Sequence, residues 1–190
     1  MPAPTQQTID AFVGAAHGDF DTVQRLLAEQ PDILNRPASW GELALGAAAQ
    51  TGQVAIAEHL LAAGAPLDIC TAAMLGRADE VAALLPAEPL GANATGAHGI
   101  PLLYHAVSTG HMDIAEMLLA HGADINGGAG GSPALHGAVM FNRVDMAEWL
   151  LARGADPNSL NHEQKTPLAA AIALKRDAVA EVLRAAERRQ

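Results

Sequence analysis

The sequence predicts an all-α solenoid of stacked helix-turn-helix pairs, with short β-hairpin fingers between the pairs. One observation is a segment that occurs three times, as AEHLLAAGAPLD at 57–68, AEMLLAHGADIN at 115–126 and AEWLLARGADPN at 147–158. The other is that apolar residues around these copies recur at the spacing of one helix face. Repeated units of this kind typically stack and bury a continuous core.

A pair of leucines sets the register of the repeats. We take as anchor the residue eight places before each pair, and successive anchors lie 34, 24, 34, 32 and 33 residues apart. This period predicts about six units, at approximately 8–38, 39–66, 67–96, 97–128, 129–161 and 162–190, after a disordered N-terminal segment at 1–7. The anchors are Gly18, Gly52, Gly76, Gly110, Asn142 and, more weakly, Lys175.

Each unit is expected to contain two short helices. In the fourth unit, apolar residues at helical spacing end at Gly110, which can adopt the left-handed conformation that closes a helix. Asn142 tolerates the same conformation, and Lys175 tolerates it less well. In the sixth unit, Thr166 can cap a helix whose first turn begins with Pro167. Helices this short are marginal below ~12 to 15 residues, so they must stack on their neighbours.

The last three units each match parts of a longer motif. They are Gly99, Pro101, Leu102, Leu103, Ala106, Gly110, His111, Leu118, Leu119, Gly122, Ala123, Asp124 and Asn126 in unit four; Leu135, His136, Ala138, Leu150, Leu151, Gly154, Ala155, Asp156 and Asn158 in unit five; and Thr166, Pro167, Leu168 and Ala171 in unit six. This set resembles the ankyrin repeats, whose pattern is Gly, Thr-Pro-Leu-His-x-Ala, Gly-His, paired leucines and Gly-Ala-Asp-x-Asn. The resemblance covers roughly residues 8–186, with degenerate caps as the first and last repeats. It implies a non-enzymatic protein–protein interaction module.

One step of the repeat is short. The 24 residues from Gly52 to Gly76 are about ten fewer than the usual period, because Asp68 runs directly into the helix-like segment 69–72. The residues that are missing would form a finger. We therefore expect no finger between repeats two and three.

The composition narrows the function classes. The net charge of -10 argues against a nucleic-acid partner, and no apolar run approaches the ~20 residues that span a bilayer. The N-terminus lacks the pattern of a secretory signal, and the single cysteine, Cys70, cannot form an internal disulfide. We expect a cytoplasmic protein that binds no membrane. Its partner should be another protein, basic or apolar at the contact, and self-association is a further option.

Candidate partner contacts lie where the repeats differ, at the fingers and at the two positions before each anchor, which should face a concave groove. Large apolar side chains there, such as Met140 and Phe141, invite a partner, although Phe141 could instead fold over a neighbouring helix. Trp40 is of a type enriched at interface hot spots, although it could pack against its own loop. The full set is Trp40, Glu42, Gln50, Thr51, His98, Ser108, Thr109, Met140, Phe141, His162 and Lys165. We expect Trp40→Ala and Phe141→Ala to weaken partner capture and to leave the melting temperature nearly unchanged.

No catalytic residue, cofactor or metal site is expected. His162-Glu163 is not followed by a second His at zinc-protease spacing, and the glycine-rich stretch at 127–131 carries no Lys for phosphate and reads as a flexible finger. A metal site from His98, His105 and a groove carboxylate lacks recognisable ligand spacing. The alternative that stays open is a small enzyme or metabolite-binding protein with a polar pocket in the groove.

Overall fold

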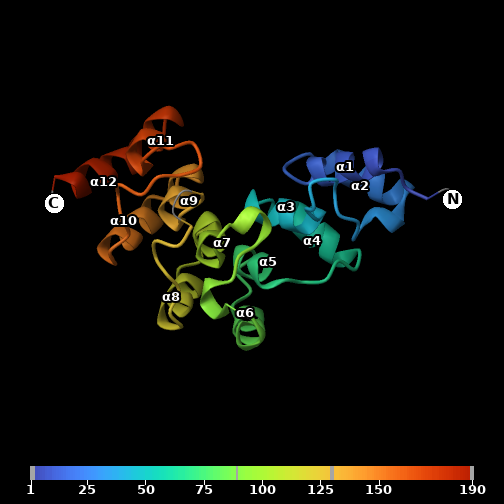
Figure 1. Cartoon of the computed structure of the whole chain (residues 1–190), viewed down its shortest axis with the longest axis horizontal. Coiled ribbons are helices and arrows are strands. Elements are labelled where there is room, and N and C mark those ends of the chain that lie inside the picture. Colours follow the sequence, from blue (N-terminus) through green and yellow to red (C-terminus); the bar gives the residue numbers. More distant parts are fainter. Residues whose placement is uncertain (1–2, 89, 129–130, 189–190) are drawn as a thin grey trace.

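The structure is a computed structural model that describes residues 3–88, 90–128 and 131–188. In this part of the chain, twelve α-helices form six consecutive pairs along a curved row (Figure 1). The pairs are α1 (Gln6–Ala15) and α2 (Phe20–Glu29), α3 (Ala44–Gln50) and α4 (Val54–Ala62), α5 (Ile69–Met74) and α6 (Ala78–Leu84), α7 (Leu102–Thr109) and α8 (Met112–Ala120), α9 (Ala134–Met140) and α10 (Val144–Ala152), and α11 (Pro167–Ala173) and α12 (Asp177–Glu187). The all-α solenoid expected from the sequence is confirmed.

The residues taken as anchors close the first helix of the pairs. The backbone angle φ is +66° at Gly52, +75° at Gly76 and +89° at Gly110, all in the left-handed region. Asn142 and Lys175 adopt the same region, with φ of +55° each, although neither is glycine. The register deduced from the paired leucines therefore places the end of the first helix correctly. Lys175 adopts a left-handed conformation that is unfavourable for most residues other than glycine.

The first helices stack on one another along the row. α7 packs between α5 and α9, and all six residues of α5 are buried. The first leucine is fully buried in three of the pairs: Leu60 lies in the N-terminal core cluster, and Leu118 and Leu150 lie in the C-terminal one. A helix pair on its own would leave an apolar face exposed to water. Each pair therefore depends on its neighbours to bury that face.

The end of the repeat motif forms a second link between units. Asn93 donates from Nδ2 to the Gly122 carbonyl at 3.0 Å, and its Oδ1 accepts from the backbone N–H of Asp124 at 2.7 Å. Asn126 repeats this arrangement one unit later, with Gly154 at 3.3 Å and Asp156 at 2.8 Å. The asparagine that closes one loop therefore holds the loop of the next unit.

The connections between pairs are loops closed by tight turns. In the described residues the only β-bridge joins Thr95 to Pro101, and backbone hydrogen bonds close the loop tips, for example from Gly96 N–H to the Ile100 carbonyl at 2.9 Å. The connection from α4 to α5 consists of residues 63–68, whereas that from α6 to α7 runs over 85–101. The predicted glycine-rich finger lies partly outside the described residues, at 129–130.

The N-terminal boundary differs from the expectation. We expected disorder over residues 1–7, yet α1 begins at Gln6, because the Thr5 hydroxyl oxygen accepts a hydrogen bond from the backbone N–H of Thr8 at 3.2 Å. This side-chain cap starts the helix within the segment that we assigned to a disordered end. Residues 1–2 lie outside the described part.

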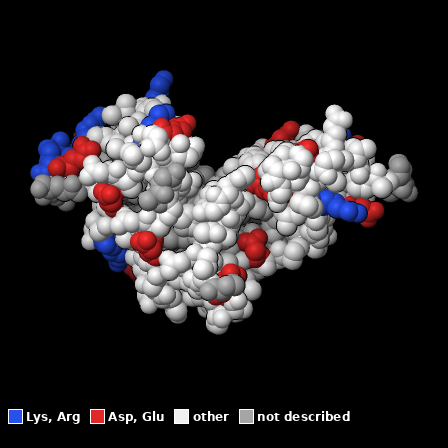
Figure 2. Space-filling model, viewed as in Figure 1, with Lys and Arg blue, Asp and Glu red and all other residues white. Residues whose placement is uncertain are grey.

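The row bends around the third pair. His105 of α7 is fully buried and its Nδ1 lies 3.4 Å from the carbonyl oxygen of Ala49 in α3, two pairs away. On the face shown in Figure 2, a hollow separates the N-terminal from the C-terminal pairs. The first helices and the loop tips border this hollow, so it is the concave face on which we expected a partner.

We expect Leu118→Ala to reduce the free energy of unfolding by ~2 to 5 kcal/mol, because it removes a fully buried side chain from between stacked pairs. Urea denaturation monitored by circular dichroism measures the loss. The matched control is Leu90→Ala at an exposed position, which should change stability by less than ~0.5 kcal/mol. A loss below ~1 kcal/mol for Leu118→Ala would contradict the assigned register.

Candidate functional site: the concave face

The candidate partner-binding residues do not form one continuous surface. The structure groups them into a cleft near the N-terminus, a packed middle section, and a cleft near the C-terminus. We call the two cavities the N-terminal cleft, lined by residues 40–43 and 95–98 among others, and the C-terminal cleft, lined by residues of α9 and α11.

The N-terminal cleft has a volume of about 380 Å³ and lies between two loop tips. Trp40, Glu42 and His98 from the candidate set line it, together with Asp68 and Glu88. No Lys or Arg is among its lining residues in the described part of the chain. The cavity therefore combines an aromatic side chain with three carboxylates.

Glu42 organises this end of the concave face. We expected it to be a partner contact, but its side chain is only 2% exposed. Its Oε2 accepts from the Trp40 indole N–H at 2.8 Å, and its Oε1 accepts from the Gln50 amide at 2.7 Å. His98 and His17 approach Oε2 at 3.4 and 3.6 Å. Because a buried carboxylate must be satisfied internally, Glu42 positions its neighbours and offers little surface to a partner.

Trp40 combines the two alternatives that the sequence left open. Its N–H is held by Glu42 within the same loop, yet the side chain is 49% exposed. The hydrogen bond restrains the ring in the free protein, which lowers the entropic cost of binding. Trp40 is thus an exposed and preorganised aromatic side chain at the edge of the N-terminal cleft.

The middle section is packed and its hydroxyl groups are satisfied by backbone carbonyls. Thr51 donates to Ala47 and Thr109 donates to Met74, both at 2.7 Å. Ser108 was expected to face the groove, but it is fully buried and donates to the His105 carbonyl at 2.8 Å. Ser108 is therefore removed from the candidate surface.

Phe141 follows one of the two alternatives that the sequence left open. It lies across the concave face, so that a Cβ placed on Gly52 would be 3.1 Å from its Cε1 atom. Its ring meets Tyr104 edge to face, with the centroids 6.3 Å apart. Phe141 thereby connects the fifth pair to the second, and its ring packs against these neighbours instead of standing free in an open groove.

The C-terminal cleft has a volume of about 340 Å³ and collects the remaining candidates Met140, His162 and Lys165. Tyr104 and Leu174 also line it, and Met140 and Leu174 are 45% and 40% exposed. Leu174 was not among the selected candidates, although it stands one residue before the anchor Lys175, as Phe141 does before Asn142. Its position relative to the anchor is the sequence signal that could have identified Leu174 as a candidate.

Two buried histidines lie beside the clefts. Burial lowers the pKa of His105 to about 4 and also lowers the pKa of His136, so both rings are neutral at pH 7. His136 uses Nε2 at 2.9 Å from the Ser159 carbonyl, and its Nδ1 is buried without a hydrogen-bond partner in the described chain. His105 similarly leaves Nε2 without a partner.

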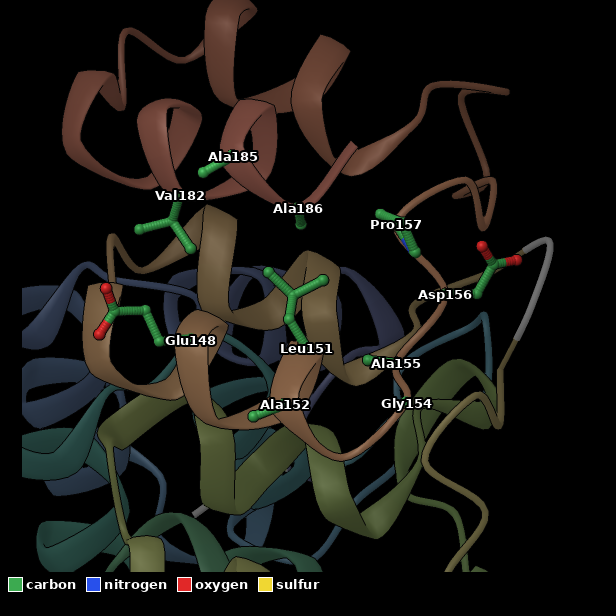
Figure 3. Close-up of a pocket in the computed structure, with 10 residues that line it drawn as sticks. All are labelled: Glu148, Leu151, Ala152, Gly154, Ala155, Asp156, Pro157, Val182, Ala185 and Ala186. Carbon is green, nitrogen blue, oxygen red and sulfur yellow. The ribbon is translucent and has the colours of Figure 1, made fainter. Parts of the chain in front are cut away.

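A third cavity lies on the side of the second helices. It has a volume of about 520 Å³ between α10 and α12, with Leu151 and Val182 pointing into it and Glu148 and Asp156 at its two ends (Figure 3). None of the candidate residues lines it. It is therefore separate from the concave face.

Neither a metal cluster nor a membrane span is found in the described residues. No group of three or more His, Cys, Asp or Glu side chains there is arranged to hold a metal ion. Of the hypothetical set, His98 approaches Glu42, whereas His105 is enclosed against Ala49. No described helix is long and apolar enough to cross a membrane.

Comparison with protein families matches residues 69–161 to a model described as ankyrin repeats in three copies. This range corresponds to the units expected at 67–96, 97–128 and 129–161. Comparison with curated proteins gives no match.

We now expect Phe141→Ala to lower the free energy of unfolding by ~2 kcal/mol, because it removes the contact between the second and fifth pairs. Trp40→Ala should cost less than ~1 kcal/mol, since half of its surface is already solvated and the lost hydrogen bond is local. Thermal and urea denaturation of both variants measure the difference. Equal melting temperatures for Phe141→Ala and the wild type would show that Phe141 does not join the two pairs.

His105 should make the fold sensitive to acid. Its pKa is lowered to about 4 in the folded chain, whereas the unfolded chain takes up the proton near pH 6.5. The unfolded state thus binds more protons between these values, so stability falls as pH decreases from about 6.5 to about 4, by about 3 kcal/mol in total. Urea denaturation across this range should show a weaker dependence for His105→Gln. Parallel pH profiles for the variant and the wild type would disprove the effect.

Proposed function

We propose, on the premise that this chain is an ankyrin repeat protein, that it binds another protein through the concave face and acts without catalysis of its own. Ankyrin repeats are generally protein–protein interaction modules. The stacked first helices supply a rigid support for such a surface, and the loop tips project beside it.

The observation that supports this proposal most strongly is the C-terminal cleft. Met140 and Leu174 keep 45% and 40% of their surface in solvent at the edge of an apolar cavity. Polar residues of the neighbouring loop, among them His162 and Lys165, border the same cavity. An apolar centre with a polar border is the usual anatomy of a protein interface.

The N-terminal cleft suggests the charge of the partner. Its carboxylates are not accompanied by Lys or Arg among the described lining residues, and the chain carries a net charge of -10. Figure 2 shows carboxylates along the hollow and basic side chains mostly toward the two outer ends of this face. A partner that is basic where it meets the N-terminal cleft and apolar where it meets the C-terminal cleft would complement both, and the basic part would accelerate association.

Phe141 determines how such a partner is bound. Because the Phe141 ring reaches Gly52 and meets the Tyr104 ring edge to face, we expect the partner to contact the two cavities separately. Loss of one cleft should therefore weaken binding without abolishing it, provided that the other cleft remains intact.

We expect the double variant Met140→Ser, Leu174→Ser to bind the partner at least about tenfold more weakly, because buried apolar anchors dominate interface energy. The control is Ile172→Ser, since Ile172 of α11 is 55% exposed but does not line the cleft. Affinity capture from native lysate identifies the protein that the wild type retains. Titration calorimetry with that purified protein then gives the dissociation constant for each variant.

Equal affinity of the double variant and the wild type would reject the C-terminal cleft as the binding surface. Light scattering of the purified chain alone tests whether a second copy of the chain occupies the C-terminal cleft. Concentration-dependent dimerisation that the double variant loses would assign the cleft to self-association. A thermal shift with metabolites that the double variant abolishes would instead support the metabolite-binding alternative.

A further inference from the structure

We propose that the third cavity, between α10 and α12, receives an aromatic side chain and an arginine from a partner protein. This cavity is separate from the concave face, so the inference goes beyond the proposed function. Its support comes from the preceding groove, between α8 and α10. There the chain fills the equivalent positions with an aromatic side chain and an arginine of its own.

In the groove between α8 and α10, the carboxylate of Glu116 meets two side chains that project from the next unit. The Trp149 indole N–H donates to its Oε1 at 3.4 Å, and the Arg153 guanidinium donates to the same oxygen at 3.2 Å. The guanidinium also lies over the Trp149 ring, 4.2 Å from the ring centroid. This cation–π contact holds the aromatic and the basic group together.

One unit later, the same positions carry small side chains. Glu148 stands 32 residues after Glu116, which is the step between the fourth and fifth anchors. Val182 and Ala186 stand 33 residues after the tryptophan and the arginine, which is the step between the fifth and sixth anchors. Both line the cavity of about 520 Å³. Small side chains thus stand beside open space where the preceding groove is filled by a ring and a guanidinium.

Glu148 is the carboxylate to which this groove supplies no arginine. In the two other copies of the repeated segment, the equivalent glutamates pair with an arginine of the following unit, Glu58 with Arg77 at 2.6 Å and Glu116 at 3.2 Å. Glu148 lies exposed at one end of the cavity (Figure 3) and makes no ion pair with any described residue. Arg184 of α12 instead pairs with a glutamate of its own helix at 2.6 Å.

The lining of the cavity favours an apolar ring beside a positive charge. Leu151 and Val182 point into it, and four alanines complete its apolar wall (Figure 3). No Lys or Arg lines it in the described chain. Asp156, at the other end, already accepts from the backbone N–H of Asn158 at 2.8 Å, so the positive charge is expected at Glu148. An acidic side chain would be repelled there, and a purely apolar one would gain nothing from the carboxylate.

A second copy of the chain complements this cavity poorly. In the described part of the chain, Trp40 is the aromatic residue among the exposed large apolar side chains. It lies in a cleft with three carboxylates and no Lys or Arg among the described lining residues. Docking this ring beside Glu148 would bring like charges together. The occupant is therefore a different protein that is basic next to its aromatic residue, the two residue types that dominate interface hot spots.

Two capped dipeptides test the proposal on the full chain. Acetyl-tryptophanyl-arginine amide carries both groups, and acetyl-tryptophanyl-glutamine amide keeps the ring but is neutral. We expect the arginine peptide to bind with a dissociation constant on the order of 1 mM, as for a ligand of this size. The glutamine peptide should bind about threefold more weakly, because the contact to an exposed carboxylate is modest. Methyl NMR should show the shifts at Leu151 and Val182.

Glu148→Gln should remove the preference for the arginine peptide. The matched control is Asp145→Asn, which removes a negative charge from the same helix outside the cavity lining and should keep the preference. The double variant Val182→Trp, Ala186→Arg fills the cavity as the preceding groove is filled. It should retain the helical circular dichroism spectrum and lose binding of both peptides. The Glu148→Gln comparison stands whether or not this double variant folds.

Equal affinities of the wild type for the two peptides would overturn the inference, as would a preference that persists in Glu148→Gln. Absence of saturable shifts up to about 10 mM arginine peptide would overturn it as well. Dimerisation in light scattering that Glu148→Gln abolishes would assign the cavity to a second copy and reject a different protein. The variant Met140→Ser, Leu174→Ser should bind both peptides like the wild type, so these outcomes are independent of the concave face.

Discussion

The stacking of the first helices is the interaction on which the rest of this structure depends. These helices are short, α5 having six residues, and none could persist alone in water. Small side chains let them approach closely, as the sequence ALGAAAQ of α3 illustrates. At Gly137 of α9, a Cβ would lie 2.8 Å from the Tyr104 ring of α7. Arginines after the anchors reinforce the stack, since Arg143 and Arg176 donate to the carbonyls of Ser108 and Met140 in the preceding units.

The shape of the concave face follows from how the stack bends. The connection between α4 and α5 is confined to residues 63–68, and α5 is completely enclosed by its neighbours. Pairs on either side of it therefore meet, through His105 and Ala49 and through Phe141 and Gly52. A surface that a regular repeat would leave as one groove is divided into two clefts. The side chains that divide it contribute to stability, and those that remain at the cleft edges are available for binding.

The two clefts differ in chemistry because they are built from residues at which the repeats differ. In the N-terminal cleft, Glu42 gathers Trp40, Gln50 and His98 into a polar group with one exposed aromatic ring. In the C-terminal cleft, Met140 and Leu174 surround a neutral imidazole. The residues that recur from repeat to repeat, such as the paired leucines and the terminal asparagine, serve burial and hydrogen bonds between loops. The residues proposed for binding in the two clefts are thus separate along the chain from those that build the scaffold.

The sequence by itself determined the helix pairs, their register and the resemblance to ankyrin repeats. The anchors close helices at Asn142 and Lys175 as they do at glycines, because spacing and backbone preference act over a few residues and can be read locally. The sequence left open whether Trp40 and Met140 are exposed, and it did not anticipate the burial of Glu42 and Ser108. Only the tertiary structure decided that Phe141 crosses to Gly52 and that Leu174 completes a cleft with Met140. Such contacts join residues far apart in the chain, and they depend on the curvature of the whole stack, which no single repeat encodes.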